Sequence, residues 1–378
     1  MTATKVHVHL FHGADPRTYR KGEDIGCLYG YHHAESDEFA LTYSQDARER
    51  RIGSIVRRAL KAALGFDIVH AWRNRDALLN ADVIWTHTEQ EHLAAALVLK
   101  LGGQRGKRPL LLAQSVWLFD RWAGYGALRR WLYRKLLARA DVLTTLARDN
   151  AALCRRYLQR DAVFVLYGLN TQDFPIDEPQ QWRPSRPLRI AAIGNDRDRD
   201  WKTFLAAFGG EERYDVRLAT RRRVPRKWHA PNVRIASASG LAKQHALYAW
   251  ADLIVVPLRP NCHASGITVM LEAAAVGKPM IVTDVGGLPD YFPHDTAAYV
   301  PPFDAQALRR AADAFAAQPD HALAVARAAA ARLRERDLTT QAFAAQHVRI
   351  TRDLLRQRHA SAPAGATPPL ADSRTSPR

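Results

Sequence analysis

The sequence of 378 residues has little cysteine, no long apolar run and a deficit of acidic residues. Its three cysteines, Cys27, Cys154 and Cys262, lie far apart without a CxxC pair, which excludes a disulfide framework and a cysteine-based zinc site and fits a reducing compartment. No apolar stretch approaches the ~20 residues of a membrane-spanning helix, and no secretory signal is visible at the start. We therefore expect a cytoplasmic protein, with peripheral contact to the inner face of the cytoplasmic membrane as an option.

The deficit of acidic residues gives the chain a large positive charge. There are 55 Lys and Arg against 38 Asp and Glu, a net charge of +17. Such an excess favours a polyanionic partner, which can be nucleic acid, an anionic membrane surface or a phosphate-bearing substrate. Hydrophobic residues make up 47% and charged residues 25%, which excludes a mostly disordered chain.

Short β-rich runs alternate with helical stretches along the chain, in two series separated by a polar, proline-containing segment. Each βαβα series predicts a parallel sheet with helices on both faces, so we expect an α/β protein with two Rossmann-like domains. The predicted strands are 6–11, 83–86, 110–113, 142–145 and 163–167, then 188–193, 216–219, 233–236, 253–257, 279–284 and 298–300. The predicted boundaries are 1–172 for the first domain, 173–187 for the linker, 188–340 for the second domain, 341–358 for a helix that packs back on the first domain, and 359–378 for a disordered tail.

The segment that follows the predicted strand 253–257 carries the clearest chemistry. Ser265 and Gly266 form a loop, and a helix begins near Thr268. Glycine lets the backbone approach a ligand, and the first free N–H groups of a helix form an anion site. Glu272 lies about one turn further on, where a carboxylate can accept both hydroxyls of a ribose. A capped helix with a surface glutamate is the alternative.

The run SGITVMLEAAAVGKPMIVTDVGGLPD at 265–290 resembles the donor-binding signature of retaining GT-B glycosyltransferases of the family 4 type, also called glycosyl transferases group 1. The resemblance implies a GT-B fold, with an acceptor-binding first domain and a nucleotide-sugar-binding second domain facing each other across a cleft. It also implies a nucleotide-sugar donor whose ribose is held by Glu272. The implied contacts of its diphosphate are Ser265, Gly266, Ile267 and Thr268.

Two further segments resemble the same family. Residues 165–174 are similar to its Gly-Val-Asp…Phe segment, with Gly168 matching and Asn170 in place of the aspartate. Residues 193–204 occupy the position of two further family features. One is a glycine loop, to which Gly194 corresponds, and the other is a phosphate-binding Arg/Lys pair.

Lys202 fits the lysine of that pair, and Arg197 or Arg199 could be the arginine; we prefer Arg199. Two cations at a diphosphate leaving group can replace a metal by stabilising the charge that develops on it. We therefore expect no cofactor and no metal.

The chain departs from the family at Ala264, where the first glutamate of a pair is expected. His263 could substitute for it, or it could be a solvated loop histidine. His87 ends the predicted strand 83–86 at the cleft edge. We assign His87 as a catalytic contact to sugar or acceptor, with a structural histidine as the alternative. Asp120 and Glu35 are weaker candidates for such a contact.

Two patterns could instead indicate metals. Asp196, Asp198 and Asp200 spell the DxD pattern of metal-dependent glycosyltransferases, but they alternate with arginines, which oppose a cation site. A further group, His7, His9 and His12, is similar to the HxH motif of barrel-shaped zinc hydrolases. The linker interrupts the eightfold series that such a barrel requires, so we do not expect metal hydrolysis.

Two basic stretches suit an anionic membrane surface. Residues 48–64 place an apolar stripe on one helical face among arginines, and 117–139 mix aromatic and basic residues. For the first stretch, we regard membrane binding and packing against the protein's own sheet as equally supported. The second stretch favours the membrane, since it has more aromatic residues than one buried stripe can hold.

Together these features predict a glycosyltransferase that moves a hexose from a nucleoside-diphosphate sugar to a glycan or lipid-linked acceptor, with retention, in bacterial-type surface polysaccharide or glycolipid synthesis. Two alternatives remain: a non-catalytic nucleic-acid-binding protein that uses the basic surface, and a nucleotide-sugar epimerase on the same fold. In the transferase interpretation no nucleic-acid partner is expected.

Overall fold

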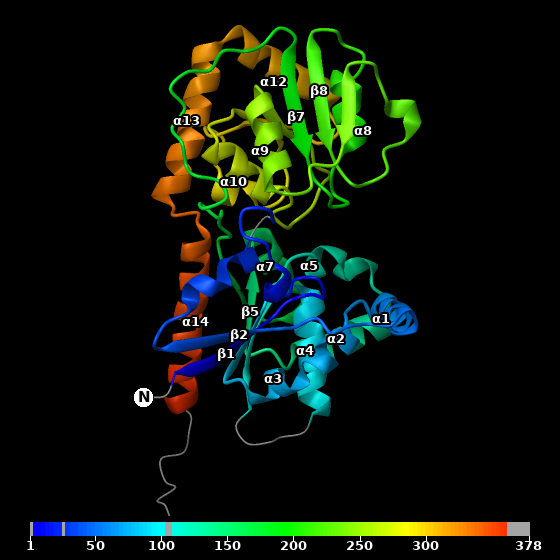
Figure 1. The fold of residues 1–378 in the computed structure, drawn as a ribbon, viewed down its shortest axis with the longest axis vertical. Helices are drawn as coiled ribbons and strands as arrows, with labels where there is room; N and C mark the ends of the chain where they lie inside the picture. The colour runs from blue at the N-terminus through cyan, green and yellow to red at the C-terminus, as the bar shows by residue number, and fades with distance from the viewer. Residues whose placement is uncertain (1–2, 25–26, 103–107, 361–378) are drawn as a thin grey trace, which may run out of the picture.

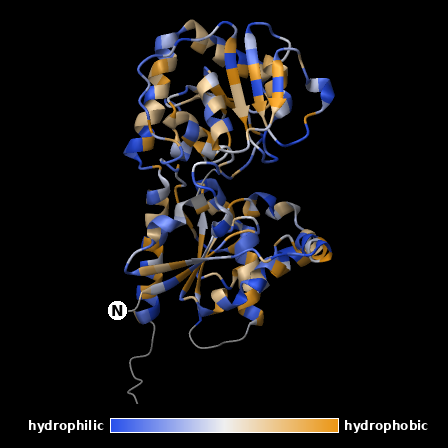
Figure 2. Ribbon diagram, viewed as in Figure 1, coloured by the Kyte–Doolittle hydropathy of each residue, from blue (hydrophilic) through white to orange (hydrophobic). Residues whose placement is uncertain are grey.

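The computed structural model describes residues 3–24, 27–102 and 108–360. It contains two six-stranded sheets, one in each half of an elongated molecule (Figure 1). The strand order is β2-β1-β3-β4-β5-β6 in the first and β12-β11-β10-β7-β8-β9 in the second, and all the paired strands are parallel. Figure 2 shows apolar residues along the strands of both sheets. This is the predicted α/β architecture of two Rossmann-like halves.

The first half, which we call the N-terminal domain, owes its core to strands that are apolar on both faces. Every residue of β3 and β4 is buried, as expected for parallel strands covered by helices on both sides. The strands are β1 (Thr4–His9), β2 (Phe39–Tyr43), β3 (Val83–Thr86), β4 (Leu110–Ser115), β5 (Val142–Thr145) and β6 (Ala162–Phe164). The helices are η1 (Pro16–Thr18), η2 (Cys27–Ala34), α1 (Arg51–Leu64), α2 (Ile68–Arg73), α3 (Arg75–Asn80), α4 (Glu89–Leu101), α5 (Leu118–Arg121), η3 (Trp122–Gly124), α6 (Ala127–Leu137) and α7 (Arg148–Leu158).

The second half, which we call the C-terminal domain, has one apolar cluster on each face of its sheet. One cluster joins the sheet to α9, α10 and α13, and the other joins it to α8 and α12. The strands are β7 (Leu188–Ile193), β8 (Tyr214–Ala219), β9 (Val233–Ala236), β10 (Leu253–Val256), β11 (Met280–Thr283) and β12 (Ala298–Val300). The helices are α8 (Trp201–Phe208), η4 (Arg226–Trp228), α9 (Leu241–Trp250), α10 (Ile267–Ala275), α11 (Leu288–Tyr291), α12 (Ala305–Ala317) and α13 (Pro319–Glu335).

The last helix, α14 (Thr340–Ala360), returns to the N-terminal domain, where it lies along the sheet (Figure 1). The Trp85 indole N–H donates to the Thr351 hydroxyl at 2.9 Å. Where the chain crosses back, Gly168 lies against Thr339 so closely that a Cβ on Gly168 would stand 2.0 Å from the Thr339 carbonyl oxygen. The glycine therefore lets two segments pass side by side between the domains.

The structure differs from the predicted elements in a few places. Strand β2 was not predicted, because residues 39–43 alternate only weakly and lie at the sheet edge. Most of the predicted tail, residues 361–378, lies outside the described residues. Within the described ranges, no helix is both long enough and apolar enough to cross a bilayer.

Candidate active site

The first turn of α10 is open. Its N-cap is Gly266, with φ of 86°, and no described side chain forms a capping hydrogen bond there. A Cβ on Gly266 would stand 2.6 Å from the Val256 side chain and 3.0 Å from Nη1 of Arg199. Glycine is therefore needed both for the left-handed turn and for the close approach of a cation. The helix N-terminus keeps its N–H groups for an anion.

Arg199 supplies a charge at the same place. Its Nε donates to Asp196 at 2.9 Å, and the side chain is almost fully buried. A Cβ on Gly194 would stand 2.2 Å from Nε, so the guanidinium lies between two glycines. Its Nη1 is buried without a hydrogen-bond partner among the described residues. A buried donor left unpaired is costly, and an anion at the start of α10 would satisfy it.

Glu272 lies one turn into the helix, as the sequence predicted. One of its oxygens accepts a hydrogen bond of 2.5 Å from the Tyr248 hydroxyl. Burial raises the pKa of Glu272 to about 7, against the opposing effects of the Tyr248 hydrogen bond and the Arg199 charge. The carboxyl group therefore changes its ionisation near neutral pH, beside a cavity that it helps to line.

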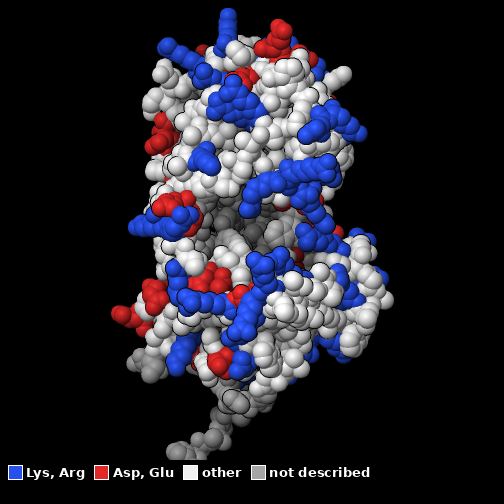
Figure 3. All heavy atoms as spheres, turned by 45° about the vertical axis from the view of Figure 1, so that its right-hand side comes forward, with Lys and Arg blue, Asp and Glu red and all other residues white. Residues whose placement is uncertain are grey.

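Two cavities meet at Arg199 and Thr268, which border both. The larger has a volume of about 430 Å³ and lies in the C-terminal domain, where Gly194 and Glu272 line it. The smaller, about 240 Å³, lies between the domains. In Figure 3, Lys and Arg side chains border the hollow between the domains both above and below. The arrangement suits an extended ligand with its negative charge in the middle and one uncharged part in each cavity.

His87 lines the smaller cavity from the end of β3. Its Nδ1 lies 3.2 Å from both the Tyr31 hydroxyl and the Gln114 side-chain nitrogen. The Tyr29 ring stacks on the imidazole with a centroid distance of 3.6 Å. Burial lowers the pKa of His87 to about 3, so the ring is neutral at physiological pH. It can donate or accept hydrogen bonds but does not supply a positive charge.

Tyr29 belongs to a backbone segment of unusual conformation. Leu28, Tyr29 and Gly30 have consecutive φ values of 48°, 56° and 79°. Residues with side chains rarely adopt this left-handed region, and such strain gathers at functional sites. The segment brings a second aromatic residue to His87, and no local sequence signal marks it.

His263 joins the two domains at the mouth of the smaller cavity. Its Nδ1 lies 2.5 Å from Asp120, on α5 of the N-terminal domain, and its Nε2 lies 3.7 Å from Asp198. The residue is 3% exposed, so the alternative of a solvated loop histidine is wrong. The weaker candidate Asp120 is brought to the site only by the docking of the domains.

The remaining predicted residues lie in different places. Ser265 turns its hydroxyl to Asp196 at 3.1 Å, and Ile267 is buried in the first turn of α10; both border the smaller cavity. Arg197 has a mostly exposed side chain, so the structure places Arg199 and not Arg197 at the helix. Lys202 is exposed on the first turn of α8 and lines neither cavity; its catalytic role stays a prediction.

The residues weighed as metal ligands are engaged elsewhere. Asp196 pairs with Arg199, and Asp200 accepts from the Thr203 N–H at the start of α8. No group of three or more His, Cys, Asp or Glu side chains in the described ranges could hold a metal ion. His7 and His9 lie on β1 of an open sheet. The barrel hydrolase interpretation therefore fails on the fold.

Comparison with known proteins gives a family match for one part of the chain. Residues 189–318 match the family described as Glycosyl transferases group 1. No curated protein sequence matches significantly.

Three solved structures share the fold over nearly the whole chain. Sucrose-phosphate synthase (tll1590) from Thermosynechococcus elongatus has a TM-score of 0.70 at 18% identity, covering 93% of this chain and 100% of that one. Anabaena Alr3699/HepE in complex with UDP and glucose has a TM-score of 0.66 at 11% identity, covering 93% and 100%. The alpha,alpha-trehalose 6-phosphate synthase from Burkholderia multivorans has a TM-score of 0.63 at 11% identity, covering 97% and 100%. The fold is GT-B-like, and the family match within it indicates a glycosyltransferase.

Proposed function

We propose that the protein transfers a hexose from a nucleoside-diphosphate sugar to a glycan or lipid-linked acceptor. The observation that carries the proposal is Nη1 of Arg199, which is buried and has no hydrogen-bond partner in the described part of the chain. It lies at the uncapped start of α10, where two cavities meet. A diphosphate would lie at that junction. The nucleoside would then occupy the larger cavity with its ribose on Glu272, and the sugar would enter the smaller cavity beside His87.

The solved relatives support a donor of this class. Anabaena Alr3699/HepE was crystallised with UDP and glucose, with UDP, and with UDP-glucose. Its fold is the fold of this chain. We carry the nucleotide-sugar donor over as a proposal, because the low identity establishes the architecture alone.

The proposed reaction is a front-face displacement with retention, as in the family 4 type that the chain resembles. The bond between the anomeric carbon and the diphosphate oxygen breaks, and an acceptor hydroxyl oxygen bonds to that carbon from the same side. The acceptor proton passes to the leaving diphosphate. Arg199 and the α10 amides stabilise the charge on the leaving group, with Lys202 as the second cation and no metal. His87, neutral and oriented by Tyr31 and Gln114, would bind a sugar hydroxyl.

The acceptor is proposed to lie at an anionic membrane, on the evidence of α1. Its apolar side chains face outward: Ile52 is 77% exposed and Ile55 64%. Arg57 is the residue that α1 buries, where it pairs with Glu49 and Asp67. A helix packed on its own sheet would show the opposite arrangement, so α1 favours a partner outside the protein.

Helix α6 extends this surface. The Arg129 guanidinium donates to the Ala63 carbonyl at the end of α1, which places the two helices together. On α6, Leu128 is 79% exposed and Trp131 57%. Several aromatic residues of 117–139 instead lie in the core, namely Phe119, Trp122 and Tyr133. Apart from the buried Arg57, the cations of the two helices are Arg51, Arg58, Lys61, Arg129, Arg130, Arg134 and Lys135. We propose that this apolar and basic surface binds the anionic cytoplasmic face of a membrane, consistent with free Cys154 and Cys262.

The test is incubation with a panel of radiolabelled nucleoside-diphosphate hexoses and a bacterial membrane extract. The proposal expects label in the extracted lipid or glycan fraction, together with released nucleoside diphosphate. A sugar that is interconverted while still bound to the nucleotide would favour the epimerase alternative. Binding to DNA with a steep salt dependence, and no transfer from any donor, would favour the nucleic-acid alternative.

A further inference from the structure

A third cavity lies in the C-terminal domain, on the face of β8 and β9 that α9 only partly covers. Its volume is about 370 Å³. Because β9 is the edge strand and several side chains here are alanines, the space between sheet and helix stays unfilled. The apolar lining is Leu218, Ala219, Ala236, Ala238, Ala246 and Leu247. A space of this size is in the range of small-molecule sites.

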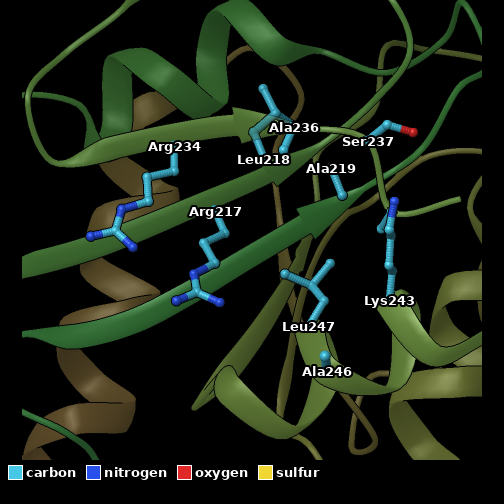
Figure 4. A pocket seen from close by; sticks show the side chains of 10 residues that line it. Arg217, Leu218, Ala219, Arg234, Ala236, Ser237, Lys243, Ala246 and Leu247 are labelled. Carbon is cyan, nitrogen blue, oxygen red and sulfur yellow. The ribbon is translucent and has the colours of Figure 1, made fainter.

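The polar part of the lining is cationic. Arg217, Arg234 and Lys243 border the cavity, and no acidic residue is among its ten lining residues. Across the described part of the chain, none of the three forms an ion pair with a carboxylate. Figure 4 shows the two guanidinium groups side by side over the sheet, with Lys243 at the other end next to Ser237. Among the described residues, the lining of the cavity thus contains three cations and no carboxylate.

The two arginines are direct cross-strand neighbours. Arg217 on β8 pairs in register with Arg234 on β9. Like charges directly opposite each other on one sheet face destabilise the sheet. The Arg217 guanidinium is also held in place, 3.9 Å from the centroid of the Trp250 ring, and its Nε is buried without a partner among the described residues. An anion between the arginines would remove the repulsion and satisfy the free donor.

We infer that this cavity binds a small phosphomonoester, with the phosphate between Arg217 and Arg234 and the body of the molecule over the alanines. The two guanidinium groups suit the dianionic charge and several acceptor oxygens of a phosphate group. Lys243 adds a positive charge at the other end of the cavity, and the apolar lining accommodates a compact organic body. The cavity shares Ala219, Ser237 and Ala238 with the proposed nucleotide cavity. The phosphomonoester would therefore lie next to the donor, and its binding and that of the nucleotide should influence each other.

The test uses the full chain at low salt. Phenyl phosphate is the probe, and inorganic phosphate is the comparison ligand that lacks an organic group. Calorimetry should show phenyl phosphate binding to the wild type more tightly than inorganic phosphate. Arg234→Gln should weaken it by about tenfold, the loss of one charge-assisted hydrogen bond, whereas Lys243→Gln, at the other end of the cavity, should weaken it less. The matched control is Arg226→Gln, an exposed cation on η4 outside the cavity, which should leave the affinity unchanged.

Thermal unfolding provides an independent readout. Because Arg234 repels Arg217 when no anion is bound, Arg234→Gln should raise the melting temperature of the unliganded protein and reduce the shift caused by phenyl phosphate. Glu272→Gln should leave that shift intact, which separates this site from the nucleotide site. Equal binding to the wild type and Arg234→Gln, no binding to the wild type, or loss of binding in Glu272→Gln would each overturn the inference.

Discussion

The Nδ1 atom of His263 lies 2.5 Å from the carboxylate of Asp120, and this contact joins the C-terminal domain to the N-terminal domain. The Cys262 N–H donates to the same oxygen at 3.0 Å. The loop that leads into α10 is thus attached to α5 across the cleft. The shape of the smaller cavity depends on this attachment, because His263 and Ala264 line it from one side and Trp117 from the other.

Replacing the carboxylate of this pair should impair transfer more than folding. In Asp120→Asn, His263 and the Cys262 N–H lose a charged acceptor, so we expect kcat/KM to fall by about tenfold or more, with a smaller change in nucleotide affinity. Steady-state kinetics and nucleotide titration measure the two effects. Asp320→Asn, an exposed residue on α13, is the control. An unchanged kcat/KM in Asp120→Asn would contradict a role for the pair in shaping the cavity.

Glu272 should make nucleotide binding depend on pH and on the ribose hydroxyls. Its pKa of about 7 lies above that of an ordinary glutamate, so the carboxylate that accepts two hydroxyls forms only as the pH rises through 7. We expect affinity to rise between pH 6 and pH 8, and the 2′-deoxy nucleotide to bind more weakly. Glu272→Gln should lose both effects. Calorimetry at several pH values with the two nucleotides measures them, and a variant that still discriminates against the deoxy form would exclude this assignment.

The same raised pKa links Glu272 to stability. Ionising a buried carboxyl costs free energy. The contribution of Glu272 to the free energy of unfolding is therefore largest below its unfolded-state pKa, and it is lost as the pH rises through about 7. Relative to the wild type, Glu272→Gln should therefore become more stable as the pH rises from 5 to 8. Thermal unfolding without nucleotide measures this difference. A difference that stays constant with pH would show that Glu272 does not titrate in this range.

His87 should act as a neutral hydrogen-bonding group. Because burial lowers its pKa to about 3, His87 should not change its charge between pH 5 and pH 8. The pH–rate profiles of the wild type and His87→Gln should therefore show the same ionisations over this range. His87→Ala should lower kcat/KM by about tenfold, and His87→Gln should retain part of the activity if one hydrogen bond to the sugar is the contribution. pH–rate profiles of the three proteins decide this. An ionisation near pH 6.5 that vanishes with the imidazole would be inconsistent with a neutral His87.

Membrane binding should depend on the outward face of α1. Ile52→Glu combined with Ile55→Glu should reduce sedimentation with phosphatidylglycerol vesicles by about tenfold without lowering the melting temperature, because both side chains are exposed. Phe303→Glu, at an exposed aromatic residue of the C-terminal domain, should sediment as the wild type does. Equal sedimentation of the α1 variant would mean that another surface binds lipid.

Local patterns could predict much of this molecule. Strands such as β3, β5 and β7 were predicted at their observed bounds, since buried parallel strands are short apolar runs between polar segments. The uncapped helix start at 265–272 could also be predicted, because a glycine, a helix start and a carboxylate one turn further on are close together in the chain.

Features that depend on tertiary contact could not be predicted in the same way. Asp120 and His263 lie 143 positions apart in the sequence and meet only in the folded protein, and Tyr248 reaches Glu272 from another helix. The left-handed segment at Tyr29 is imposed by its surroundings and not by glycine alone. The outward orientation of α1 could not be read either, because an amphipathic pattern gives a helix two faces without saying which one meets the protein.

The central claim, that Arg199 and the start of α10 bind the diphosphate of a nucleotide donor, is tested most directly by calorimetric titration with a panel of nucleoside diphosphates. Arg199→Ala should weaken binding of the preferred nucleotide by about 10–100-fold, because a buried charge-assisted hydrogen bond is lost. Arg197→Ala, two residues away with a mostly exposed side chain, should bind as the wild type does. Equal affinities of the wild type and Arg199→Ala, or no binding of any nucleoside diphosphate to the wild type, would contradict the account.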